Sequence, residues 1–226
     1  MSRGFHGRRM GHSPGLLTRL YRWLRGSEQV LVRPVAELPL VLISYAKGDA
    51  EGVEPFRESL EGIWAALPES FRQRYAEALR VAPPLVVVLL RRRNICSCLG
   101  HHHPSGTESR LTRKLRSLSG VRTGELDLAF EAIREWEPLP LSHLALPPEA
   151  GTKETSSLQW RLALLAVFLH ELHHLTHPEE PESAVRSRSQ QFYADALSHF
   201  VYERFGVEFG LRPETEAAPP PMAPNR

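Results

Sequence analysis

Two histidines and a glutamate in the last third of the chain have the types and the spacing for metal chemistry. His170, Glu171 and His174 form the pattern H-E-x-x-H. On a helix, the four-residue step between the histidines places both imidazoles on one face, where together they can hold one zinc ion. The glutamate beside them is then available as a general base. The pattern therefore predicts a site for zinc-dependent peptide hydrolysis.

The sequence around this motif predicts a buried helix. Residues 158–169 form an almost unbroken apolar run, interrupted by Gln159 and Arg161. The helix should therefore enter a hydrophobic core before it reaches its histidines. Ser156, three residues before Gln159, predicts a capping box, and Pro178 predicts the end of the helix. Because an unpaired charge is costly in a core, we expect the polar groups of the motif to be paired or metal-bound.

A catalytic zinc takes three protein ligands and a water, so the motif needs a third ligand. His177 is unsuitable because it follows His170 by seven residues, or about 10 Å along the helix axis. His173 should point to the side, where we expect it to pack or to orient a ligand. The third ligand is therefore expected on the next helix, predicted from about Glu182 to Phe205.

That second helix carries a polar face and a family pattern. Arg188, Gln191, Asp195 and His199 recur at three- or four-residue steps and so share a face. The segment Gln191-Phe-Tyr-Ala-Asp-Ala-Leu-Ser198 after H-E-x-x-H resembles the HtpX-like zinc metallopeptidases, whose helix reads E-F-x-A-D-x-x-A. It is also similar to the E-x-x-A-D segment of the cytosolic ImmA/IrrE-like peptidases. The resemblance covers roughly residues 158–200 and implies a gluzincin-type zincin.

The chain departs from this family pattern at the metal-binding position. Gln191 stands where the families place a glutamate ligand, and a neutral amide is a poorer zinc ligand than a carboxylate. We therefore predict zinc ligands His170, His174 and Asp195, with Glu171 as the general base. Two alternatives stay open: Gln191 or His199 ligates or orients a ligand, or Asp195 only orients a zinc-bound histidine. A transition-state stabiliser is expected among Tyr193, Tyr202 and Arg188.

The substitution at Gln191 also motivates a second function, a zincin-like domain that binds metal for regulation or interaction without catalysis. The predicted fold class is α+β. It is a zincin-like domain with a small mixed sheet packed on the active-site helix and a long C-terminal helix after it. Buried strands are predicted at 40–45 and 85–90, with helices at 54–66 and 69–81 between them. Residues 125–130 predict either a strand or the start of a helix.

A peptide or protein substrate would add as a strand beside the active-site helix, and residues 85–90 and 121–130 are the candidate edge strands. Three regions are predicted along the chain. Residues 1–30 form a basic, partly disordered N-terminal segment with one helix that packs on the domain, or alternatively lies on a membrane or partner. Residues 31–210 form the metallopeptidase domain. Residues 211–226 form a disordered Pro-rich tail.

Residues 91–122 predict a mobile basic loop ahead of a short helix. The loop contains Cys96, Cys98 and His101–His103, but their spacing does not match the usual zinc fingers. No aromatic platform is interleaved with its arginines, which argues against nucleic acid. The two cysteines are too close to enclose a stabilising loop, so we expect no disulfide framework and a cytoplasmic, reducing location.

Composition bounds these predictions. The chain has 226 residues, of which 42% are hydrophobic, enough for a real core in one domain. A net charge of +2 favours neither nucleic acid nor a membrane surface as partner. No apolar run reaches the length of about 18 residues that a transmembrane helix needs.

Overall fold

The computed structural model describes residues 26–94, 98–136 and 152–205. A five-stranded mixed sheet has the strand order β1-β2-β3-β5-β4. Its three central strands, β2, β3 and β5, run parallel, and the two edge strands are antiparallel to their neighbours. The strands are β1 (Ser27–Leu31), β2 (Leu40–Ala46), β3 (Leu85–Arg91), β4 (Gly100–His102) and β5 (Thr123–Ala129).

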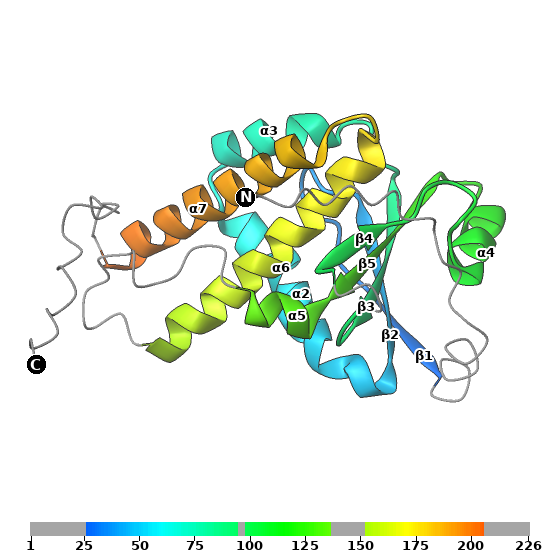
Figure 1. Cartoon of the computed structure of the whole chain (residues 1–226), viewed down its shortest axis with the longest axis horizontal. Helices are drawn as coiled ribbons and strands as arrows, with labels where there is room; N and C mark the ends of the chain where they lie inside the picture. The colour runs from blue at the N-terminus through cyan, green and yellow to red at the C-terminus, as the bar shows by residue number, and fades with distance from the viewer. Residues whose placement is uncertain (1–25, 95–97, 137–151, 206–226) are drawn as a thin grey trace, which may run out of the picture.

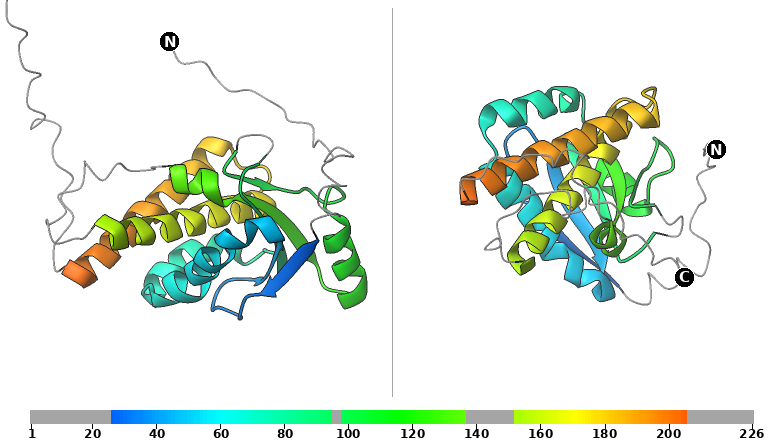
Figure 2. Two further views of the ribbon diagram at one scale, coloured as in Figure 1. Left: turned by 90° about the horizontal axis from the view of Figure 1, so that it is seen from below. Right: turned by 60° about the vertical axis from the view of Figure 1, so that its left-hand side comes forward.

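Helices connect and cover the sheet. The connection from β2 to β3 comprises η1 (Lys47–Gly52), α2 (Val53–Glu58), η2 (Ser59–Trp64), α3 (Glu69–Ala76) and η3 (Glu77–Leu79). The others are α4 (Arg110–Ser119), α5 (Phe130–Glu135), α6 (Thr152–Thr176) and α7 (Glu182–Phe205). The two long helices, α6 and α7, lie side by side and antiparallel, with α4 at the opposite end of the molecule from the last turns of α7 (Figures 1 and 2).

One face of the sheet packs against α6. Leu126 and Leu128 on β5 pair with Val88 and Leu90 on β3, and all four are buried in the main core. Gly124 lies on the same face, because an added Cβ there would fall 2.3 Å from a methyl carbon of Leu175 on α6. The apolar run of α6 fills the other side of this layer, so the helix that carries the motif is held by the core.

The opposite face of β5 carries acids that anchor α4. The carboxylate of Glu125 is 1% exposed and accepts hydrogen bonds from the backbone N–H and the hydroxyl of Ser109 and from the hydroxyl of Thr112. Arg116 donates to the carboxylate of Glu108 and to the carbonyl of Thr123. These bonds satisfy groups that would otherwise be buried without partners. At least one arginine of the basic segment 91–122, Arg116, therefore stabilises the fold.

Most predicted elements are confirmed. The strands at 40–45 and 85–90 form β2 and β3, helices occupy most of 54–66 and 69–81, and a long helix begins at Glu182. Both alternatives for 125–130 occur in turn, since β5 is followed at once by α5. Of the predicted fold class, the mixed sheet packed on α6 and followed by a long helix is present.

Four expectations are wrong. Residues 91–122 are not a loop throughout, because β4 pairs with β5 within them. The capping box at Ser156 fails because α6 begins at Thr152, one turn earlier. Neither candidate edge strand is an edge, since β3 and β5 are both paired on two sides. Finally, Cys98 is disulfide-bonded, and the other cysteine, Cys96, lies outside the described residues.

A strand at 27–31 was also not predicted. The predicted N-terminal helix and the Pro-rich tail lie outside the described residues. Among the residues that the structure describes, no helix is both long and apolar enough to cross a membrane.

His103, next to the edge strand β4, makes the stability of the fold depend on pH. Its Nε2 lies 3.3 Å from Asp127 Oδ2 and 3.8 Å from Glu125 Oε1. Burial alone would lower the pKa of His103, but its ion pair with Asp127 and the negative charge of Glu125 raise that pKa above its ordinary value. A raised folded pKa stabilises the fold fully below the unfolded value of 6.5, and this stabilisation is lost as pH rises through the folded pKa.

We therefore expect His103→Gln to lower the free energy of unfolding more at pH 5.5 than at pH 9. Urea unfolding of both proteins at the two pH values measures this difference. Asp127→Asn removes the nearest partner, so in that background the pH dependence of the His103→Gln effect should shrink. An effect of His103→Gln that is equal at both pH values would contradict the pairing.

Candidate metal centre

The site lies at the hairpin between α6 and α7. His170 and His174 are in the last two turns of α6, and Glu182 is the first residue of α7. Only residues 177–181 separate the helices, and the connection ends in Pro181, which cannot continue a regular helix from α6. Because so short a turn forces the helices to be antiparallel neighbours, the end of α6 must lie beside the start of α7.

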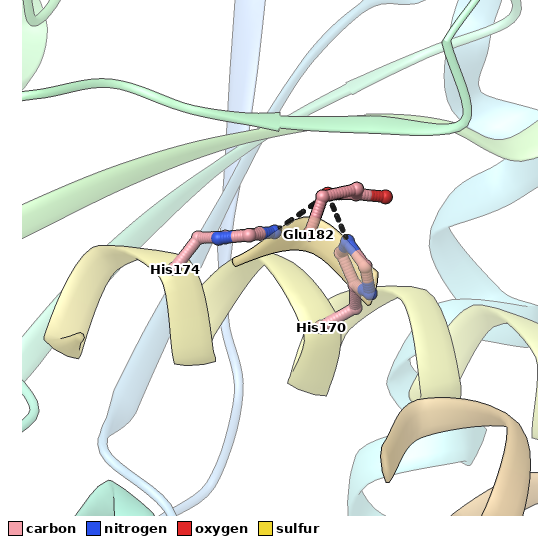
Figure 3. A group of neighbouring side chains, drawn as sticks. All are labelled: His170, His174 and Glu182. Atoms are coloured by element: carbon pink, nitrogen blue, oxygen red, sulfur yellow. Dashed lines mark hydrogen bonds and ion pairs between the residues drawn. The ribbon is translucent and has the colours of Figure 1, made fainter. Parts of the chain in front are cut away.

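The two imidazoles and the carboxylate converge, as Figure 3 shows. Glu182 Oε2 lies 2.9 Å from His174 Nε2 and 3.5 Å from His170 Nε2. One ligand atom from each of the three residues lies within 4.8 Å of the others. Ligands about 2.0 Å from one tetrahedral metal are about 3.3 Å from each other, so these separations fit a shared ion. The group can hold a metal.

A hydrogen-bond chain contacts the Nδ1 side of the His170 ring. Ser189 Oγ donates its proton to the carbonyl of Arg186 at 2.9 Å. Toward His170 Nδ1, 3.2 Å away, the hydroxyl is then left as an acceptor. A proton on Nδ1 would bond to this acceptor and would leave the lone pair of Nε2 for a metal. Metal-ligating histidines are oriented in this way by a partner at their other nitrogen.

Charges around the group favour the ligand forms. Burial lowers the pKa of His170, which keeps the imidazole neutral near pH 7. Burial would raise the pKa of Glu182, but the hydrogen bond from Arg186 and the neighbouring histidines outweigh it and lower that pKa. Arg186 Nη2 binds Oε1 of Glu182 at 2.8 Å and so leaves Oε2 to the histidines. The carboxylate side chain is 55% exposed, which leaves one side of the group open to water.

Glu171 lies beneath the edge strand β4. The residue is 7% exposed, and its side chain occupies the space that a side chain at Gly100 would take. An added Cβ at Gly100 would fall 2.5 Å from Cγ and 2.7 Å from Oε1 of Glu171. On the same strand, His102 Nδ1 is 3.7 Å from Glu171 Oε2, and the His102 ring stacks on His174 with centroids 5.4 Å apart. The predicted base is thus held against β4.

Gly100→Ala should destabilise the fold by about 1–3 kcal/mol, since the new methyl group collides with a buried side chain. Gly62→Ala is the matched control, because Gly62 is exposed, sits in η2 and has no atom within 4 Å of an added Cβ. In a helix, alanine is more favourable than glycine by up to about 1 kcal/mol, so the control should gain stability. Urea unfolding measures both, and equal effects would contradict the close packing of Glu171 on β4.

The structure does not bring the predicted third ligand to the histidines. Asp195 Oδ2 accepts a hydrogen bond of 2.6 Å from the hydroxyl of Tyr75, and Oδ1 accepts one of 2.6 Å from Gln191. The ring of His199 packs on Phe200. Asp195 is 13 residues beyond Glu182, which is about 20 Å along α7. In an antiparallel hairpin it therefore faces an earlier part of α6.

Of the predicted transition-state stabilisers, Arg188 lines a pocket together with His170 and His173, whereas the two tyrosines lie away from the metal group. Tyr193 is 1% exposed in the core. Tyr202 is 20 residues after Glu182, about 30 Å along the helix. Arg188 donates to the ring of His173 and to Glu180, whose Oε2 is 3.1 Å from His173 Nε2. His173 is 4% exposed, so it has the packing role expected of it, and with its partners it braces the turn before Glu182.

Glu182, Ser189, Gly100 and His102 are the residues of the site that sequence reasoning missed. The first two carry a usable signal: a five-residue turn with two prolines predicts that residues just after it meet residues just before it. The sequence marks His102 only as part of the His101–His103 run, and nothing local marks Gly100, because the place of both residues beside Glu171 depends on strand pairing. Comparison with known proteins gives no match to this chain, whether with family models, with curated proteins or with solved structures.

Proposed function

We propose that the chain is a zinc-dependent metallopeptidase in which His170, His174 and Glu182 hold the metal and Glu171 is the general base. The observation that carries the proposal is the convergence of two imidazoles and a carboxylate beside a second, buried carboxylate. Two histidines and a glutamate are the ligands of a common class of catalytic zinc site. The zincin-like arrangement expected from the motif belongs to the same proposal.

Zinc in such a site acidifies a bound water and polarises a carbonyl. Glu171 takes the proton of the attacking water and delivers it to the nitrogen of the leaving amine. His170 and Glu182 keep their ligand atoms oriented through Ser189 and Arg186. The site has its carboxylate ligand in Glu182, so Gln191 does not leave it one charge short. Gln191 therefore no longer argues for a metal-binding domain without catalysis.

The decisive experiment measures metal content and hydrolysis together. Protein purified without added chelator should carry one zinc per chain by mass spectrometry, and it should cleave members of an unstructured peptide library. A chelator should stop cleavage, and one equivalent of zinc should restore it. Zinc binding without cleavage would refute the peptidase and support a metal-binding domain without catalysis. A chain that takes up no zinc would refute both of these functions.

A further inference from the structure

His102 is the residue of β4 that faces both parts of the site. Successive side chains of a strand point to opposite faces, so His102 shares the face of Gly100, which is packed on Glu171. Its ring is nearly parallel to that of His174, with an interplanar angle of 19°, and its Nδ1 is 3.7 Å from Glu171 Oε2. His102 therefore touches a proposed ligand and the proposed base at once.

Glu171 needs such a partner. A carboxylate that is 7% exposed is costly unless a hydrogen bond or an opposite charge compensates it. Among the residues that the structure describes, His102 is the only ion-pair partner of Glu171. Gly100 bounds the carboxyl group near Oε1, and His102 lies beside Oε2. Together they fix the rotation of the carboxylate from both of its oxygens.

We infer that His102 is a positioning residue that acts through Glu171, with its Nδ1–H directed at Oε2 of the base; this inference rests on the proposed function. The distance of 3.7 Å is longer than a hydrogen bond, and bonds of this kind commonly tighten when substrate binds. A base fixed in this way meets the attacking water in one orientation. His102 only orients the base in this role, so it adds no step to the proton transfers of the hydrolysis.

The test compares His102→Ala with His102→Asn, because the amide N–H of asparagine can replace Nδ1–H. We expect kcat to fall about 10–100-fold in His102→Ala, as is typical when a residue that orients a catalytic group is removed. KM and zinc affinity should stay unchanged, and His102→Asn should recover most of the loss. His101→Ala is the matched control, since this neighbour on β4 lies on the opposite face and should leave kcat unaltered.

A binding measurement separates positioning from general damage. Acetohydroxamate chelates a metal and hydrogen-bonds to a carboxylate beside it, so its affinity reports the position of that carboxylate. Its affinity for cobalt-substituted protein, followed by visible absorbance, should fall about 10-fold in His102→Ala, because a carboxylate that is no longer held in place makes this hydrogen bond poorly. In a Glu171→Gln background, the same substitution should have no effect, because residues that act through one another are not additive.

Three results would overturn the inference: unchanged kcat and acetohydroxamate affinity in His102→Ala, a loss explained wholly by lost metal, or an equal loss in His101→Ala. Failure of the proposed function is distinguishable, because it would appear in the wild-type protein as absent zinc or absent cleavage. If the wild-type protein binds cobalt without cleaving peptides, the acetohydroxamate measurements still decide whether His102 acts through Glu171.

Discussion

Glu182→Ala is expected to weaken zinc binding by more than about 100-fold, while Asp195→Ala leaves it unchanged. Loss of a residue that only orients a ligand costs about 10–100-fold, so loss of a charged ligand should exceed that range. Glu182 Oε2 is the atom shared by both histidines, whereas both oxygens of Asp195 are already bonded to Tyr75 and Gln191. Competition with a chromophoric chelator measures the affinities.

The matched control for this experiment is Glu179→Ala, which removes an exposed acid from the same turn. It should retain wild-type affinity, which would show that the loss in Glu182→Ala is specific and not a general effect of charge. The opposite pattern, with zinc lost in Asp195→Ala and kept in Glu182→Ala, would restore the assignment predicted from the sequence. Glu182→Asp should fall between the two, because the shorter side chain keeps the charge but retracts it from the histidines.

Glu171→Gln should reduce kcat/KM by about 10²–10⁴-fold with zinc content unchanged, because it removes a general base but no ligand. Glutamine has nearly the same shape, so it preserves the packing against Gly100 and keeps the fold intact. The measurement is the hydrolysis of a cleaved peptide by protein of known zinc content. Glu179→Gln serves as the control for the loss of a carboxylate outside the site. Full activity in zinc-loaded Glu171→Gln would exclude this residue as the base.

The two experiments separate binding from chemistry. Glu182→Ala tests the ligand set. It should lower activity only as far as it lowers zinc occupancy or distorts the coordination of the zinc that remains bound. Glu171→Gln tests catalysis in a protein that still holds its metal. Loss of zinc in Glu182→Ala would support the proposed ligand set. Loss of turnover with full zinc content in Glu171→Gln would support the proposed general base.

Local sequence patterns predicted the central elements of the fold. The apolar runs of β2 and β3 need no partner to be recognised, since interior parallel strands are buried on both faces and read as continuous hydrophobic segments. The edge strands β1 and β4 were missed for the converse reason. They are short or polar, and β4 contains two histidines in three residues. Such strands are defined by the neighbour with which they pair rather than by their own side chains.

By itself, the sequence determined that His170 and His174 share a helical face with Glu171 beside them. This relation depends only on the 3.6-residue period of the helix. The apolar run before the motif predicts that helix. Only the tertiary structure decided what meets that face. Glu182, Ser189 and His102 reach it through a helical hairpin and a strand pairing, which are contacts between segments distant in the chain. The family pattern pointed instead to Asp195, about 20 Å further along α7, because a pattern of letters carries no information on where two antiparallel helices stop facing each other.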